Sequence, residues 1–139
     1  MKPLEYINRL LNETSDTEGK YCRGYCGEFA VALHRVFGYK LGGFYEKEED
    51  DWGITFGMIH VFAYHPKDKS LVIDARGIRP KADVKSSLIS FTGETPKKLV
   101  ERQTTENDID AEGGEGINEE LVNEAIEYIN KNKQKYQTK

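Results

Sequence analysis

Two β-rich segments and the turn between them decide the fold of this 139-residue chain: ITFGMIHVFAY (residues 54–64), HPKDK (65–69) and SLVIDA (70–75). The first and third segments are rich in β-branched and aromatic residues, which favour strands. The middle segment combines a proline with polar residues, a composition typical of turns. The stretch therefore predicts an antiparallel hairpin near the middle of the fold.

This hairpin would bring a histidine and an aspartate together. If the five-residue loop closes with Tyr64 paired to Ser70, His60 lies opposite Asp74. Directly opposed side chains share a face of the sheet, with Cβ atoms roughly 4.5–5.5 Å apart. The imidazole can then donate a hydrogen bond to the carboxylate. The prediction depends on register, because a slip of one residue puts the two side chains on opposite faces.

A helix before the hairpin should pack on it. Apolar residues recur at helical spacing over residues 26–37, and Gly38 follows as a C-cap. The stripe comprises Cys26, Phe29, Ala30, Leu33 and Phe37. Docking it on the sheet places Cys26 at one end of the interface, facing His60. The partial positive charge at a helix N-terminus and a neighbouring imidazolium both favour thiolate over thiol.

Together the three side chains have the chemistry of a nucleophilic site. We predict that Cys26 is the nucleophile, His60 the base that activates it, and Asp74 the group that orients the base. The thiolate would attack a carbonyl and form an acyl-enzyme, which water or an amine then releases, without a metal or organic cofactor. The N–H of Cys26 is one candidate oxyanion donor. Further oxyanion or substrate-cleft candidates are Lys20, Tyr21, Tyr25 and Trp52.

The same residues resemble a known superfamily. The runs RGYCGEF (23–29), IHVF (59–62) and VIDARG (72–77) resemble the core of transglutaminase-like and papain-like cysteine enzymes. The separations of 34 residues from Cys26 to His60 and 14 from His60 to Asp74 are similar to those of the transglutaminase-like and arylamine N-acetyltransferase branches. The acetyltransferases also have a glycine and an aromatic residue just before the nucleophile.

The resemblance covers about residues 21–80 and implies a papain-like core with a Cys-His-Asp triad. The substrate it implies is an amide or thioester, carried by a protein or peptide. It does not choose among peptidase, amidase, transglutaminase, deamidase and acyltransferase. The chain is too short for a complete N-acetyltransferase, which carries further domains after the triad.

The rest of the chain predicts an α+β fold, with N-terminal helices on an antiparallel sheet and a C-terminal helix. The further expected elements are a helix over residues 3–12, a strand over 41–45, a solvated acidic loop over 46–51, a strand over 88–91, a mobile acidic linker over 104–116, an Asn118-capped amphipathic helix over 119–132 and a fraying basic tail. The expected division is a catalytic-type domain over residues 1–102, a flexible linker over 103–117, and a helix with tail over 118–139, either separate or part of the same domain.

Composition narrows the classes of partner. The 24 acidic residues outnumber the 20 basic ones, which argues against nucleic acid. No apolar run is long enough to cross a bilayer, and the first residues lack the apolar run of a secretory signal. We therefore expect a cytoplasmic protein with no membrane partner. Two cysteines four residues apart do not make a disulfide scaffold.

Other interpretations of these residues stay open. Asp74 could instead pair with Arg76 or Arg79. A metal site built from Cys22, Cys26, His34 and His60 is conceivable, although zinc sites usually show two closely spaced pairs of ligands. The chain could also be a non-catalytic papain-like binding module, such as a phage or bacterial accessory protein. Its C-terminal amphipathic helix would then lie in a partner's groove.

Overall fold

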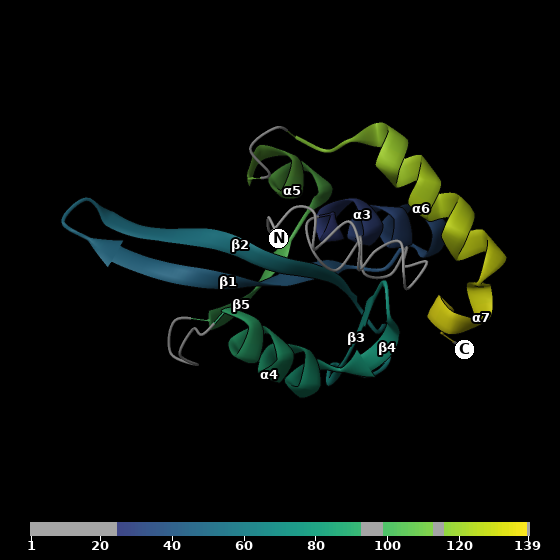
Figure 1. Cartoon of the computed structure of the whole chain (residues 1–139), viewed down its shortest axis with the longest axis horizontal. Coiled ribbons are helices and arrows are strands. Elements are labelled where there is room, and N and C mark those ends of the chain that lie inside the picture. The colour runs from purple at the N-terminus through teal and green to yellow at the C-terminus, as the bar shows by residue number, and fades with distance from the viewer. Residues whose placement is uncertain (1–24, 93–98, 113–115, 139) are drawn as a thin grey trace, which may run out of the picture.

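A computed structural model describes residues 25–92, 99–112 and 116–138 of the chain. The elements in chain order are α3 (Cys26–Phe37), β1 (Leu41–Asp50), β2 (Gly53–Tyr64), β3 (Leu71–Asp74), β4 (Gly77–Pro80), α4 (Lys81–Thr92), β5 (Leu99–Thr104), α5 (Glu106–Glu112), α6 (Glu119–Lys131) and α7 (Lys133–Tyr136). The strands form an antiparallel sheet of order β4-β3-β2-β1-β5, so the α+β class is confirmed (Figure 1). The helix expected over residues 3–12 lies outside the described part.

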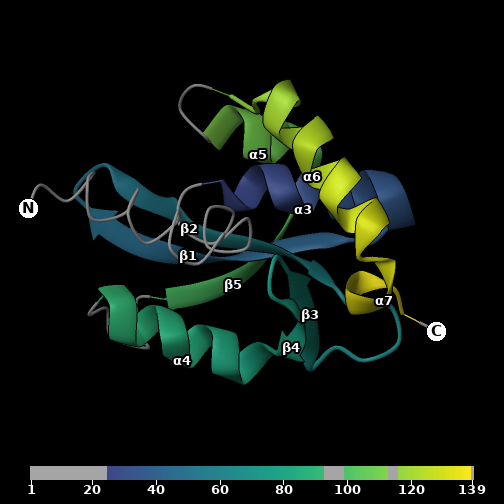
Figure 2. The ribbon, with the colours of Figure 1, turned by 45° about the vertical axis from the view of Figure 1, so that its right-hand side comes forward.

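Helices cover both faces of this sheet, with α3 and α6 on one side and α4 on the other (Figure 2). The expected helix over residues 26–37 is confirmed as α3, and Gly38 ends it in the left-handed conformation, with φ of 77°. Its middle turns, from Phe29 to Leu33, are at most 1% exposed, between the sheet and α6. Among the described residues, no helix is both long and apolar enough to cross a membrane.

The last long helix belongs to this core. Asn118 caps α6 as predicted, since its side chain accepts hydrogen bonds from the N–H groups of Glu120 and Leu121. The apolar face of α6 packs on α3, and Val122, Ala125 and Ile129 are 0% exposed. This face is therefore occupied inside the molecule. It does not offer the free apolar surface that the binding-module interpretation assigned to it.

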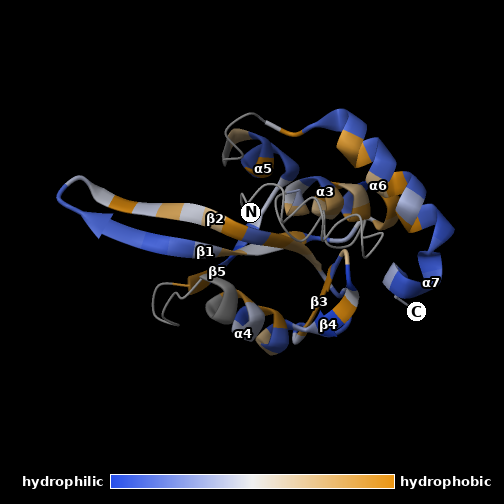
Figure 3. Ribbon diagram, in the orientation of Figure 1, coloured by the Kyte–Doolittle hydropathy of each residue, from blue (hydrophilic) through white to orange (hydrophobic). Residues whose placement is uncertain are grey.

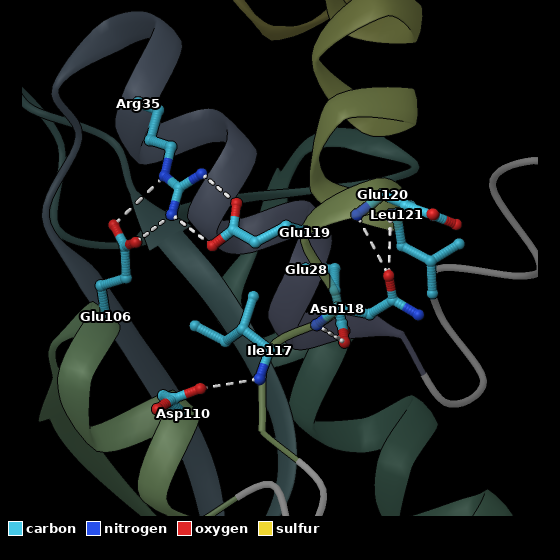
Figure 4. Close-up of polar contacts among 9 residues, drawn as sticks. All are labelled: Glu28, Arg35, Glu106, Asp110, Ile117, Asn118, Glu119, Glu120 and Leu121. Carbon is cyan, nitrogen blue, oxygen red and sulfur yellow. Dashed lines mark hydrogen bonds and ion pairs between the residues drawn. The ribbon is translucent and has the colours of Figure 1, made fainter.

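The prediction of a mobile linker over residues 104–116 is wrong for most of this segment. Residues 99–104 form β5, which pairs with β1, and α5 follows at once. The Thr105 hydroxyl accepts a hydrogen bond from the N–H of Asp108, and Ile109 is only 3% exposed. Arg35 of α3 forms ion pairs with Glu106 of α5 and Glu119 of α6, so one guanidinium joins three helices (Figure 4). Capping and this ion-pair cluster stabilise the described part of the segment, residues 104–112, whose acidic composition predicted a mobile linker.

The prediction of an acidic loop over residues 46–51 is also wrong, because β1 continues to Asp50. Its second half pairs with the start of β2, ending at the Asp50–Gly53 pair. The Asp50 carboxylate accepts a hydrogen bond of 2.8 Å from the N–H of Trp52, and Gly53 has φ of 130°. A tight turn at Asp51–Trp52 therefore closes a long hairpin, and the acidic side chains lie along a strand.

The strand expected over residues 88–91 is wrong, since those residues lie in α4. Val84 and Leu88 have the i, i+4 spacing of one helix face and pack on the sheet against Phe44, Phe62 and Val72. The short strand β4, which precedes α4, was not expected from the sequence. It ends at Pro80, and α4 begins at the next residue.

The basic tail was expected to fray, but its described residues are ordered up to residue 138. Residues 133–136 form α7, and Tyr136 is 0% exposed. Its hydroxyl donates a 2.6 Å hydrogen bond to the carbonyl of Ala75, while the Tyr39 hydroxyl donates to the carbonyl of Tyr136. The tail thus fixes the position of the Ala75 backbone, directly after Asp74.

We expect Tyr136→Phe to lower the free energy of unfolding by about 1–3 kcal/mol, because the buried carbonyl of Ala75 loses its donor. Urea denaturation followed by circular dichroism measures this change. Tyr128→Phe is the matched control, since the Tyr128 ring packs against the Tyr136 ring. Equal stability of wild type and Tyr136→Phe would contradict the role given to this hydroxyl.

Candidate active site

The register between β2 and β3 differs from the predicted one by two residues. Tyr64 pairs with Val72 and Ala63 with Ile73, whereas we expected Tyr64 opposite Ser70. The reason is the turn: the Asp68 carboxylate accepts hydrogen bonds from the N–H and hydroxyl of Ser70, which holds Ser70 in the loop. A shift of two residues preserves the face of every side chain. His60 and Asp74 are therefore diagonal neighbours rather than opposite ones.

The predicted contact between these two side chains is present. His60 Nε2 lies 3.2 Å from Asp74 Oδ2, and each residue is 3% exposed. Burial alone would lower the pKa of His60. Its hydrogen bonds to Asp74 and to Cys26, and the negative charge of both groups, raise that pKa instead to about 9. This shift favours the charged form of the imidazole. Because Nε2 is engaged by Asp74, Nδ1 is the ring nitrogen left for the thiol.

Cys26 is the first residue of α3 and is half-buried. Burial alone would raise the pKa of its thiol, and the charge of Glu28 adds to this. The hydrogen bond with His60, the charge of the imidazolium and a hydrogen bond from the backbone N–H of Val61 outweigh both and lower the pKa of Cys26. A lowered thiol pKa beside a raised imidazole pKa describes a thiolate–imidazolium pair.

Asp74 is held at both oxygens. Its Oδ1 accepts a 3.0 Å hydrogen bond from the N–H of Arg76, and its Oδ2 accepts from His60 and from the Arg79 guanidinium. Burial would raise the pKa of this carboxyl, but the hydrogen bonds and charges of His60 and Arg79 lower it. The alternative pairing of Asp74 with Arg79 is therefore found together with the pairing to His60. Arg79 keeps the carboxylate charged and fixes its position.

The oxyanion and cleft candidates are not all brought to this site. Tyr25 directly precedes Cys26 and is 44% exposed. Trp52 lies in the turn between β1 and β2 and is 96% exposed. Eight residues of extended chain separate Trp52 from His60, about 25 Å at the usual rise of a strand. The structure therefore does not place Trp52 beside the triad. Lys20 and Tyr21 lie outside the described residues.

The metal site considered from the sequence does not assemble in the described part of the chain. His34 lies two helical turns from Cys26, and its Nδ1 is 2.7 Å from the carbonyl of Tyr39. No group of three His, Cys, Asp or Glu side chains among the described residues has the arrangement of a metal site. The fourth candidate ligand, Cys22, lies outside those residues.

The site therefore consists of a thiol, an imidazole and a carboxylate in sequence, with an arginine behind the carboxylate. Cys26 comes from the start of α3, His60 from β2 and Asp74 from the end of β3. Arg79, from β4, is the residue that sequence reasoning considered only as a competitor. Comparison of the chain with models of protein families, with curated proteins and with solved structures found no match.

Proposed function

We propose that this protein is a cysteine-dependent acyl-transfer or hydrolase enzyme with a papain-like or transglutaminase-like core. The observation that supports this most strongly is the buried imidazole of His60, which contacts the thiol of Cys26 and the carboxylate of Asp74 at once. The substrate class we propose is an amide or thioester of a protein or peptide. Peptidase, amidase, deamidase and transglutaminase reactions share the same first step.

In that step the Cys26 thiolate attacks the substrate carbonyl carbon, and a carbon–sulfur bond forms as the carbonyl electrons move to oxygen. The N–H of Cys26 at the start of α3 is the oxyanion donor that this chain offers. The His60 imidazolium then gives its proton to the departing amine or thiolate, and the acyl-enzyme forms. Neutral His60 next takes a proton from water or an acceptor amine, which attacks the acyl group and releases Cys26.

Asp74 and Arg79 act through His60. The carboxylate fixes the imidazole so that one nitrogen faces the thiol, and it stabilises the positive charge. Arg79 holds the carboxylate in place and keeps it ionised. We therefore regard Cys26 and His60 as catalytic residues and Asp74 and Arg79 as positioning residues.

Acyl-enzyme formation can be tested without knowing the substrate. We expect p-nitrophenyl acetate to release a burst of one equivalent of nitrophenolate at pH 7 and to acetylate Cys26, because a thiolate attacks this ester readily. Stopped-flow absorbance of nitrophenolate measures the burst, and peptide mass spectrometry locates the acetyl group.

Cys22→Ser is the matched control for this experiment, and it should keep the burst. Cys26→Ser should lose the burst, and His60→Ala should strongly slow it. Acetylation that spreads equally over Cys22, Cys26 and surface lysines would mean that Cys26 is not an activated nucleophile, and the proposed function would then be wrong.

A further inference from the structure

Over most of its length, one edge of β2 pairs with no strand of the described part of the chain. Within β2 only Ala63 and Tyr64 pair with β3, so the β3-facing edge of residues 53–62 has no partner strand among the described residues. We call this stretch the open edge. On its other side β2 is paired to β1 from Gly53 to Ala63, with one irregularity opposite Phe44/Tyr45, and the two strands extend from the body of the molecule as a long ribbon (Figure 1). Unpaired N–H and C=O groups along a strand form a template for another extended chain.

The open edge lacks most of the features that usually block strand addition. Residues 53–59, GITFGMI, contain no charged residue and no proline. The irregularity in β2 lies opposite Phe44/Tyr45, near the end of the ribbon closest to the sheet, and the pairing from Gly53 to Met58 is regular. At Gly57 a Cβ would meet nothing within 4 Å. Natural edges are usually protected by lysine, proline or a bulge.

The open edge leads to the nucleophile. Cys26 packs against the buried cluster that includes Val61, near the inner end of this edge, and the backbone of Val61 also provides a hydrogen bond to the thiol. A strand laid along this edge would therefore reach the thiol. Three large apolar side chains are exposed in the described part: Trp52 in the turn at the tip of the ribbon, Ile54 near the start of β2, and Tyr25, which directly precedes Cys26 in the sequence.

Charge indicates the kind of chain that fits. The neighbouring strand and turn, residues 46–51, contain five acidic residues and one lysine. Figure 3 shows this hydrophilic half of β1 beside the more apolar β2. An added strand would lie two strand spacings from β1, roughly 10 Å, which long lysine and arginine side chains can span. The ribbon therefore favours a basic segment.

Two other occupants fit less well. A second copy of the chain, paired edge to edge, would bring a second acidic ribbon to the same place. Residues 1–24 contain four acidic and four basic residues, and the apolar spacing of residues 3–12 predicts a helix. That segment offers neither net positive charge nor the alternation of a strand.

We propose that the open edge binds an extended, basic segment of a protein substrate by strand addition and leads it to Cys26. The identification of this segment as substrate rests on the proposed function, whereas its binding does not.

The probe is a fluorescent eight-residue peptide of alternating lysine and valine, titrated into the full chain and followed by anisotropy. We expect it to bind, and we expect Glu48→Lys/Glu49→Lys to weaken binding at least tenfold. Both glutamates are exposed on the ribbon. Glu120→Lys/Glu127→Lys changes the net charge equally on the exposed face of α6 and should leave binding unchanged. A peptide N-methylated at every residue keeps the charges, cannot donate backbone hydrogen bonds, and should bind at least tenfold more weakly.

Hydrogen exchange on the free chain tests the other occupants. Amides of the open edge should exchange rapidly and become protected when the peptide binds. Protection in the free chain, with or without a dimer in sedimentation, would show that the edge is already covered and would overturn the proposal. Equal binding of the N-methylated peptide, or no binding of the lysine–valine peptide, would do the same.

The docking proposal and the proposed catalytic function can fail separately. If the peptide binds while Cys26 titrates as an ordinary thiol, strand docking is supported and the catalytic function is wrong. If the thiol is activated but the peptide does not bind, only the docking proposal is wrong.

Discussion

His60→Ala should slow alkylation of Cys26 by iodoacetamide at pH 7 by about tenfold or more, measured in a Cys22→Ser background. The cause is the balance of effects on the thiol. Burial raises the pKa of Cys26, and His60 supplies most of what lowers it. Without the imidazole, the effect of burial is the largest one left, and the pKa of Cys26 rises above the ordinary value of about 8.5. Only about 3% of a thiol with that pKa is ionised at pH 7.

The control for this prediction is His65→Ala. His65 lies in the turn after β2, where its Nδ1 accepts hydrogen bonds from the N–H groups of Lys67 and Asp68. Its replacement removes an imidazole without touching the thiol, so the alkylation rate should stay within twofold of the background rate. Equal rates for His60→Ala and the background protein would show that His60 does not activate Cys26.

Removal of all residues after Arg102 should leave a chain that no longer unfolds cooperatively. The truncation deletes α6 and α7, whose Val122, Ile129 and Tyr136 side chains are 0% exposed, and uncovers α3. Each such side chain contributes about 1.5–3 kcal/mol by burial, against a total stability of about 5–15 kcal/mol for a typical domain. Urea unfolding followed by circular dichroism measures the loss.

A single substitution in the full chain gives the same test on a finer scale. Ile129→Ala should lower the free energy of unfolding by about 2–5 kcal/mol, the usual range for such a cavity in a core. Glu127→Ala, on the exposed side of the same helix, should change it little. A truncated chain that unfolds at the wild-type midpoint would mean that α6 is accessory, and the fold would then end at β5.

The elements with clear apolar periodicity could be predicted from the sequence. α3 and α6 follow from their stripes and caps, at Gly38 and Asn118 respectively. β2 follows from its run of β-branched and aromatic residues. In each case the local pattern and the tertiary packing favour the same structure, so a single window of sequence was sufficient.

The elements that were missed depend on partners distant in the sequence. Residues 46–50 are acidic and form a strand only because β2 pairs with them. α5 owes its order to Thr105 and to Arg35, 71 residues before Glu106. Tyr136 is held in its buried position by two hydrogen bonds, one from its hydroxyl to the carbonyl of Ala75 and one from the Tyr39 hydroxyl to its own carbonyl. No local window contains these partners.

The triad could be predicted in spite of a register error. We expected His60 directly opposite Asp74, and the true register is shifted by two residues. The prediction of contact survived because alternation along a strand has a period of two. Arg79 could not be assigned its position behind Asp74, because the strand that carries it, β4, was not foreseen.

The most direct measurement is the ionisation of Cys26 itself. The absorbance of thiolate at 240 nm is titrated against pH in Cys22→Ser, and the curve of the Cys22→Ser/Cys26→Ser chain is subtracted. We predict a midpoint well below the ordinary thiol pKa of about 8.5, because the imidazolium of His60, whose pKa is raised by its hydrogen bonds to Asp74 and Cys26, stabilises the negative charge of the thiolate. A midpoint at or above 8.5 would show that burial prevails, that Cys26 is a packed thiol, and that the proposed catalytic triad is wrong.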